Sequence, residues 1–245
     1  MRLNSHLYLG RHASKKINMF KRIVIIYLLL GFAPRIFAQT MPIPNGGFED
    51  WITYPFTIYE TPKCWTDNDL LYQRFDPAYK GITVIKTTQS HTGKYALQMG
   101  VTFNHGDTVN GGIYSTGNMD SLLRLLQHTA AAGFPCSQKY GNFTGYYIFN
   151  ALPGDTAVFG AILTRWNWGK RSRDTIVNSV LRTGDVQADY VPFTVPLKYR
   201  IKNEVPDTAF ISIGIQSQSV KQAKIGTTLI IDDLIFSGRP PHNEQ

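Results

Sequence analysis

The stretch Gly226-Thr227-Thr228-Leu229-Ile230-Ile231-Asp232-Asp233-Leu234-Ile235 decides the fold that we expect for this chain. It reads as a strand, and each face of that strand is apolar except for one Asp, because successive side chains point to opposite faces. A second motif, Asn45-Gly46-Gly47-Phe48-Glu49-Asp50-Trp51, stands near the other end. Together the two motifs predict a β-sandwich whose first and last strands lie side by side, with acidic residues at the seam.

Residues 1–38 have the layout of a secretory signal peptide. Lys21 and Arg22 precede an apolar run over 23–32, and Ala38 offers a small residue before cleavage. The run is too short for a comfortable membrane span, although an uncleaved anchor is the alternative, and translation could start at Met19. We therefore expect an exported protein, in the periplasm, at the cell surface or outside the cell, with no stable membrane span after signal cleavage.

The charge of the chain resides mostly in this leader. The sequence has 25 Lys and Arg against 17 Asp and Glu. Seven of the basic residues and none of the acidic ones lie in residues 1–38, so the remainder is nearly neutral, with 18 basic and 17 acidic residues. Bulk charge therefore gives no support to a nucleic-acid partner.

Most of the mature chain reads as short strands separated by Gly, Pro and Asp turns, which is typical of an all-β antiparallel sandwich. The predicted strands cover 82–86, 95–99, 146–149, 157–166, 191–199, 209–215 and 229–236. The segment 191–199 carries two prolines and suits an edge strand. Residues 119–128 have helical composition and predict one short helix in a loop insertion. We expect a single domain over 39–238 and a flexible tail over 239–245.

An ordered set of segments resembles the Bacteroidetes putative carbohydrate metabolism domain family, whose exported members have a jelly-roll, galactose-binding-like fold. The matching segments are 45–51, Pro62 with Trp65, 91–97, 133–135, 145–147, 154–157, Tyr190 with Phe193, 195–199, 206–207 and 226–234. The chain departs from the family at Ile148, where Lys is common, and at Gln216-Ser217-Gln218-Ser219, where paired Ser is common. The resemblance implies the jelly roll and contact with carbohydrate.

The acidic residues of the two end motifs are candidate calcium ligands. A carboxylate among apolar neighbours needs a partner, and a hard cation with oxygen ligands would supply one. Similar carbohydrate-binding jelly rolls join the opening Glu to an Asp of the closing strand through a structural calcium, which here implies Glu49 with Asp232 or Asp233. In the alternative, the Asp side chains accept backbone N–H groups or pair with Lys or Arg.

The candidate sugar-binding residues lie in one segment. Flat aromatic rings stack on pyranose rings, and planar polar groups nearby can bond to hydroxyls. In an extended chain Trp166 and Trp168 project to one side and Arg165 and Asn167 to the other. The alternatives are that the two rings fill the core and that the basic residues 165, 170, 171 and 173 form a solvated loop.

Two cysteines, Cys64 and Cys136, are a candidate disulfide pair in an oxidising compartment, although they are distant in sequence. A catalytic pair of carboxylates is harder to find. Asp232 and Asp233 should point apart, and Asp67 and Asp69 share a face but lie in a polar segment that reads as a turn. We therefore expect no enzymatic activity.

These inferences predict a non-catalytic, exported carbohydrate-binding module of the cell envelope. One alternative is a structural or adhesion protein that binds another envelope protein through an apolar patch over 122–126. Another is a glycoside hydrolase or an esterase.

Overall fold

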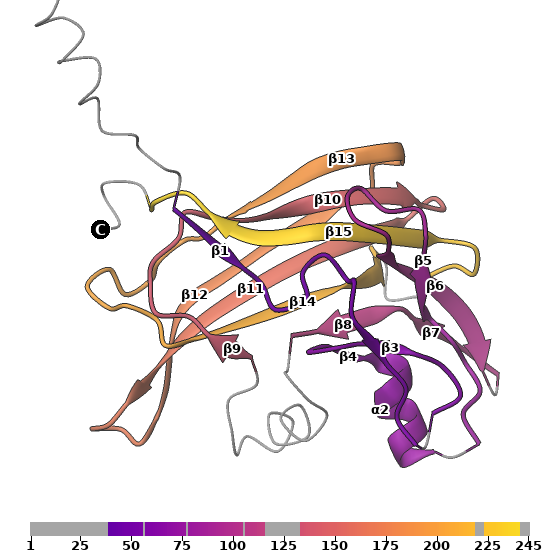
Figure 1. Ribbon diagram of the computed structural model, residues 1–245, viewed down its shortest axis with the longest axis horizontal. Coiled ribbons are helices and arrows are strands. Elements are labelled where there is room, and N and C mark those ends of the chain that lie inside the picture. The colour runs from indigo at the N-terminus through magenta and orange to yellow at the C-terminus, as the bar shows by residue number, and fades with distance from the viewer. Residues whose placement is uncertain are drawn as a thin grey trace, which may run out of the picture. The chain divides into compact units, whose positions relative to one another are not determined.

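The computed structural model describes residues 39–55, 57–76, 78–104, 106–115, 133–218 and 223–240. Within these ranges the chain forms an antiparallel β-sandwich, which confirms the predicted fold class (Figure 1). The predicted signal peptide, the predicted helix over 119–128 and residues 241–245 of the predicted tail lie outside the described residues. Among the described residues no helix is long and apolar enough to cross a membrane.

The first sheet contains the closing strand near its centre. Its main path runs β13 (Gln187–Pro196), β10 (Asn142–Asn150), β15 (Thr228–Ser237), β6 (Ala96–Asn104) and β5 (Val84–Thr87). Strand β1 (Thr40–Pro42) adds to β15, and β7 (Asp107–Asn110) adds to β6. Because β13 ends the path, its two prolines lie on an edge strand, as predicted.

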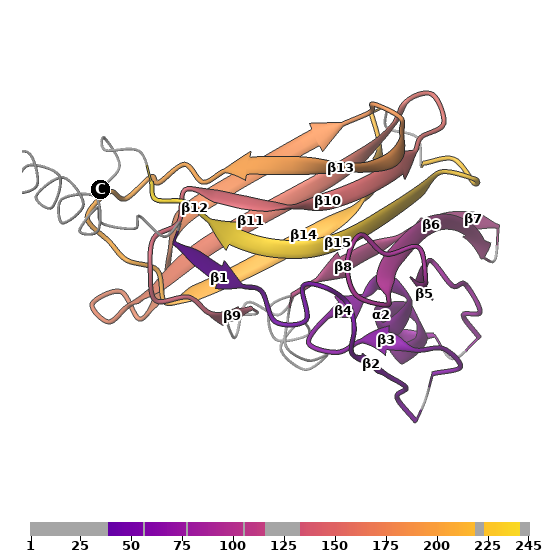
Figure 2. The same cartoon turned by 45° about the horizontal axis from the view of Figure 1, so that its top comes forward.

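The second sheet packs against the first (Figure 2). Its path runs β12 (Ser172–Thr183), β11 (Asp155–Asn167), β14 (Thr208–Ser217), β8 (Gly112–Tyr114) and β4 (Thr66–Asp67), with β9 (Phe134–Pro135) added to β14. Strands β2 (Trp51–Ile52) and β3 (Thr61–Pro62) form a separate pair, and the helix α2 (Asn68–Phe75) follows β4.

The two ends of the domain lie side by side, as the end motifs predict. Thr40 of β1 pairs with Ser237 of β15, and the Leu234 N–H donates to the Gly46 carbonyl at 2.9 Å. A Cβ on Gly46 would stand 2.5 Å from the Leu234 carbonyl oxygen, so only glycine fits this approach.

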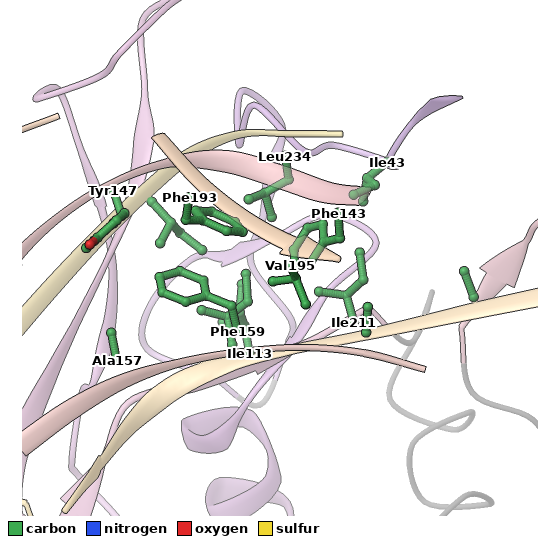
Figure 3. Close-up of a cluster of buried hydrophobic side chains, with 14 of the residues drawn as sticks. Ile43, Ile113, Phe143, Tyr147, Ala157, Phe159, Phe193, Val195, Ile211 and Leu234 are labelled. Carbon is green, nitrogen blue, oxygen red and sulfur yellow. The ribbon is translucent and has the colours of Figure 1, made fainter. Parts of the chain in front are cut away.

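Aromatic and branched side chains from both sheets fill the space between them (Figure 3). Phe159 of β11 stacks on Phe193 of β13 with ring centroids 4.1 Å apart, and Phe143 of β10 meets Phe193 edge-on at 5.2 Å. Trp65 is 1% exposed, and Trp51 packs against the same core. Burial of these large rings is the main stabilising contribution to the sandwich.

The interpretation of residues 66–69 as a polar turn was wrong. Asp67 is the N-cap of α2, and its side chain accepts the Leu70 N–H at 2.6 Å. The Asp69 carboxylate accepts bonds from the Tyr79 hydroxyl, the Thr83 N–H and hydroxyl, and the Val84 N–H. Both Asp side chains are fully buried, so this segment ties the helix to β5.

Candidate functional site

The candidate sugar-binding residues lie at the turn between β11 and β12. These two strands form a long hairpin, and its turn lies at the end of the sandwich opposite α2 (Figures 1 and 2). The hairpin pairs from Ala157 with Thr183 to Asn167 with Ser172. A bulge in β12 at Ile176 shifts the pairing register between Leu163 and Thr164. The pairs near the turn are therefore offset by one residue from the pairs in the rest of the hairpin.

The structure places Trp166 and Trp168 beside each other. Their ring centroids are 6.1 Å apart and their planes meet at 81°, an edge-to-face pair. Trp168 is 84% exposed, whereas Trp166 is half-buried. The alternative that the rings fill the core is therefore wrong for Trp168, since a ring with most of its surface in water contributes little to packing.

Both indoles line a groove of about 630 Å³. Arg165 of β11 and residues from two other segments complete its lining: Pro135, Cys136, Ser137, Val205, Pro206 and Asp207. A smaller hollow of about 210 Å³ on the same hairpin is lined by Arg165, Trp166, Asn167, Trp168, Asp174, Ile176 and Glu204. The four predicted residues are thus gathered at one place, and three of them, Arg165, Trp166 and Trp168, line the larger groove, whose volume is in the range that small ligands use.

Asp207 fixes the position of Trp166. Its carboxylate accepts the backbone N–H of Trp166 at 2.8 Å and pairs with the Arg173 guanidinium at 2.5 Å. Although burial opposes ionisation, these contacts hold the pKa of Asp207 below its ordinary value. Sequence reasoning missed this role, because the contact joins residues 41 positions apart; the only signal was the Pro206-Asp207 pair within the family resemblance.

The polar neighbours of the indoles are also held by the protein. Asn167 donates to Asp174 at 2.6 Å, and Asp174 also pairs with Lys170 at 2.9 Å. These contacts lower the pKa of Asp174. Arg165 pairs with Glu204 at 2.5 Å. Residues 165, 170 and 171 are exposed, which agrees with the solvated-loop alternative, although residues 165, 170 and 173 also have ion-pair partners.

The candidate calcium ligands lie at the seam, against the turn that precedes β6. The buried Asp232 carboxylate accepts the N–H groups of His91 at 2.8 Å and Thr92 at 3.2 Å. Asp233 contacts the same two residues, with 2.7 Å to His91 Nδ1 and 2.7 Å to the Thr92 hydroxyl. Glu49 accepts the N–H groups of residues 94 and 95.

The expectation that Asp232 and Asp233 face opposite sides was wrong. Asp233 has a φ of 52°, and the pairing of β15 with β10 shifts register between Thr144 and Tyr146. This bulge breaks the strict alternation of side chains, so both carboxylates reach one turn. Burial raises the pKa of Asp232 despite the N–H groups that donate to it.

The three carboxylates fit the alternative in which protein donors satisfy them. Both oxygens of Asp232 and both of Asp233 accept protein hydrogen bonds. Within the described ranges, no three His, Cys, Asp or Glu side chains are arranged to hold a metal. Calcium at the seam stays a prediction.

Thermal melting tests the calcium prediction. A metal that binds only the folded state raises the melting temperature, so metal-free protein should melt at a lower temperature than protein in excess calcium. Magnesium at the same concentration is the control for ionic strength. Equal melting temperatures in calcium and in chelator would discard the prediction.

The candidate disulfide is not formed, because Cys64 and Cys136 are both free thiols. Cys64 precedes β4, and strand β8 separates β4 from β14. Cys136 lies directly beside the start of β14, because its N–H donates to the Asp207 carbonyl. Burial raises the pKa of the Cys136 thiol to about 11, so this side chain is a poor nucleophile.

No family model matches the chain, and no curated protein matches it in sequence. Solved structures do match it. A "putative glycoside hydrolase" from Bacteroides thetaiotaomicron shares 14% identity with a TM-score of 0.58, over 82% of this chain and 72% of its own. Another "putative glycoside hydrolase", from Bacteroides vulgatus, shares 15% identity with a TM-score of 0.55, over 80% of this chain and 96% of its own.

A family 11 carbohydrate-binding module from Clostridium thermocellum, solved with a β-1,3-1,4-linked tetrasaccharide, shares 10% identity over 73% of this chain and 91% of its own. Its TM-score of 0.38 is too low to bear on function. At these identities the likeness to the Bacteroides proteins concerns the fold alone. The chain is an antiparallel β-sandwich of jelly-roll type.

Proposed function

We propose that this protein is a non-catalytic, exported carbohydrate-binding module that belongs to the Bacteroidetes carbohydrate metabolism domain family resembled by its sequence. The observation that carries the proposal is the exposed Trp168 ring beside Trp166 at the mouth of a largely apolar groove. Sugar rings present flat C–H faces that match the face of an exposed indole, and an aromatic pair beside an apolar groove is typical of a ligand-binding site.

The charged groups at the groove favour binding over catalysis. A glycosidase needs a carboxylic acid with a raised pKa opposite a second carboxylate. Asp207 and Asp174 have lowered pKa values and are ion-paired, which does not suit a proton donor. Among the described residues, the Asp side chains with raised pKa values are 67, 69 and 232, and all three are buried away from the groove.

Removal of the exposed indole tests the proposal. We expect Trp168→Ala to weaken binding to polysaccharide by about tenfold or more, because loss of one stacked ring costs on the order of 1.4 kcal/mol or more. Affinity gel electrophoresis of residues 39–245 on a panel of plant, algal and microbial polysaccharides measures the effect. Trp166→Ala with Trp168→Ala should abolish retardation.

Phe103→Ala is the matched control. Phe103 is an exposed aromatic residue, 60% accessible, on β6, outside both hollows at the hairpin. Its replacement should leave retardation unchanged. Absence of retardation of the unaltered protein on every polysaccharide, or equal retardation of the Trp double variant, would refute the proposal.

A further inference from the structure

The charged side chains that line the groove are paired with opposite charges. Each charged side chain that lines the two hollows has an oppositely charged partner within 3 Å: Arg165 with Glu204, Asp174 with Lys170, and Asp207 with Arg173. These pairs are partly exposed, so each adds little to stability. Their effect on a ligand is larger, because paired charges leave little net field in the groove.

An anionic ligand would meet two obstacles at this site. Its carboxylate or sulfate would compete with Glu204, Asp174 and Asp207 for cations that already donate to these side chains. It would also bring a further negative charge close to three carboxylates, a like-charge contact that disfavours binding.

A neutral sugar avoids both obstacles. Its C–H faces can cover Trp168 and the apolar wall formed by Pro135, Val205 and Pro206. Its hydroxyls can bond to the free lone pairs of the exposed carboxylates without breaking an ion pair, since a carboxylate accepts several hydrogen bonds.

From this arrangement we infer that the hairpin groove selects neutral glycans and rejects uronate- and sulfate-bearing ones. The inference rests on the proposed function and adds to it the chemical class of the ligand. Stacking and neutral hydrogen bonds then dominate affinity, so binding should be almost independent of ionic strength.

Affinity gels with two sets of polysaccharide test the inference. The neutral set contains β-glucans, xylans, galactans and mannans, and the anionic set contains polygalacturonate, alginate and a sulfated galactan. We expect retardation on at least one neutral gel, with a change below about twofold between low and moderate NaCl, and none on the anionic gels. Glu204→Gln with Asp174→Asn frees two cations, and this variant should gain salt-sensitive retardation on anionic gels.

The outcomes separate the inference from the proposed function. Retardation of the unaltered protein on anionic gels alone, lost in salt and lost in Trp168→Ala, would keep carbohydrate binding and overturn neutral selectivity. Absence of retardation on both sets would overturn both. Retardation that survives Trp168→Ala on every gel would place the binding elsewhere and also overturn both.

Discussion

Replacement of Asp67 by Asn is expected to stabilise the protein at mildly alkaline pH and to leave it unchanged near pH 4. Burial raises the pKa of Asp67 from 3.8 to about 7, with a smaller contribution from Asp69. The folded state therefore keeps a proton that the unfolded state releases between about pH 4 and 7, and stability falls as pH rises through this window. This difference in pKa between the two states corresponds to roughly 4 kcal/mol.

The Asp67→Asn variant avoids this cost because its amide side chain is neutral at every pH. The amide also keeps an oxygen for the Leu70 N–H, so the helix retains its N-cap. Denaturant unfolding of both proteins at about pH 4, 6 and 8 measures the difference in free energy of unfolding. Asp67→Ala, which removes the cap as well, should be destabilising at every pH. If the free energy of unfolding depends on pH in the same way in Asp67→Asn and in the unaltered protein, the raised pKa of Asp67 is contradicted.

Replacement of Asp232 by Ala is expected to lower the free energy of unfolding by about 3 kcal/mol. The change leaves the N–H groups of His91, Thr92 and Asp233 without their acceptor. It also releases the turn before β6 from the closing strand, so the seam should exchange amide hydrogens faster.

Asp233→Gly is the matched truncation at the neighbouring position. Asp233 contacts the same turn from a partly exposed position, and its φ of 52° is favourable for glycine. We expect a loss near 1 kcal/mol or less. Equal losses for the two variants would show that burial of Asp232 does not determine the strength of the seam.

The sandwich was predictable because several of its strands are long and because Gly, Pro and Asp residues mark the turns between them. The segments predicted at 209–215 and 229–236 match β14 and β15 within two residues at each end. Strand β12 was missed because its bulge puts two consecutive apolar residues, Ile176 and Val177, into the core, which breaks the period of two. Helix α2 was missed because its eight residues carry a weak apolar pattern, and because its N-cap Asp67 and its first-turn Asp69 are both buried.

The candidate site was only half predictable. Trp166 and Trp168 are two residues apart, so their proximity was predictable, although Trp168 lies in the turn after β11 and not in the extended strand that we expected. The opposite wall comes from Pro135 and Pro206, and the support comes from Asp207, which only the packing of β9 and β14 beside β11 brings near. The bulge at Asp233 was equally hidden, because a left-handed residue inside a strand depends on the surrounding pairing.

The pairing of β1 with β15 brings residues 39 and 238 together, where the Gly238 N–H donates to the Gln39 carbonyl at 2.9 Å. A short peptide could therefore join these positions, and new termini could be opened at the β6–β7 hairpin around Gly106, where a Cβ would meet nothing within 4 Å. Such a circular permutant should fold and keep the groove. It would also allow the domain to be immobilised from the end that carries α2, which leaves the tryptophan hairpin facing the ligand.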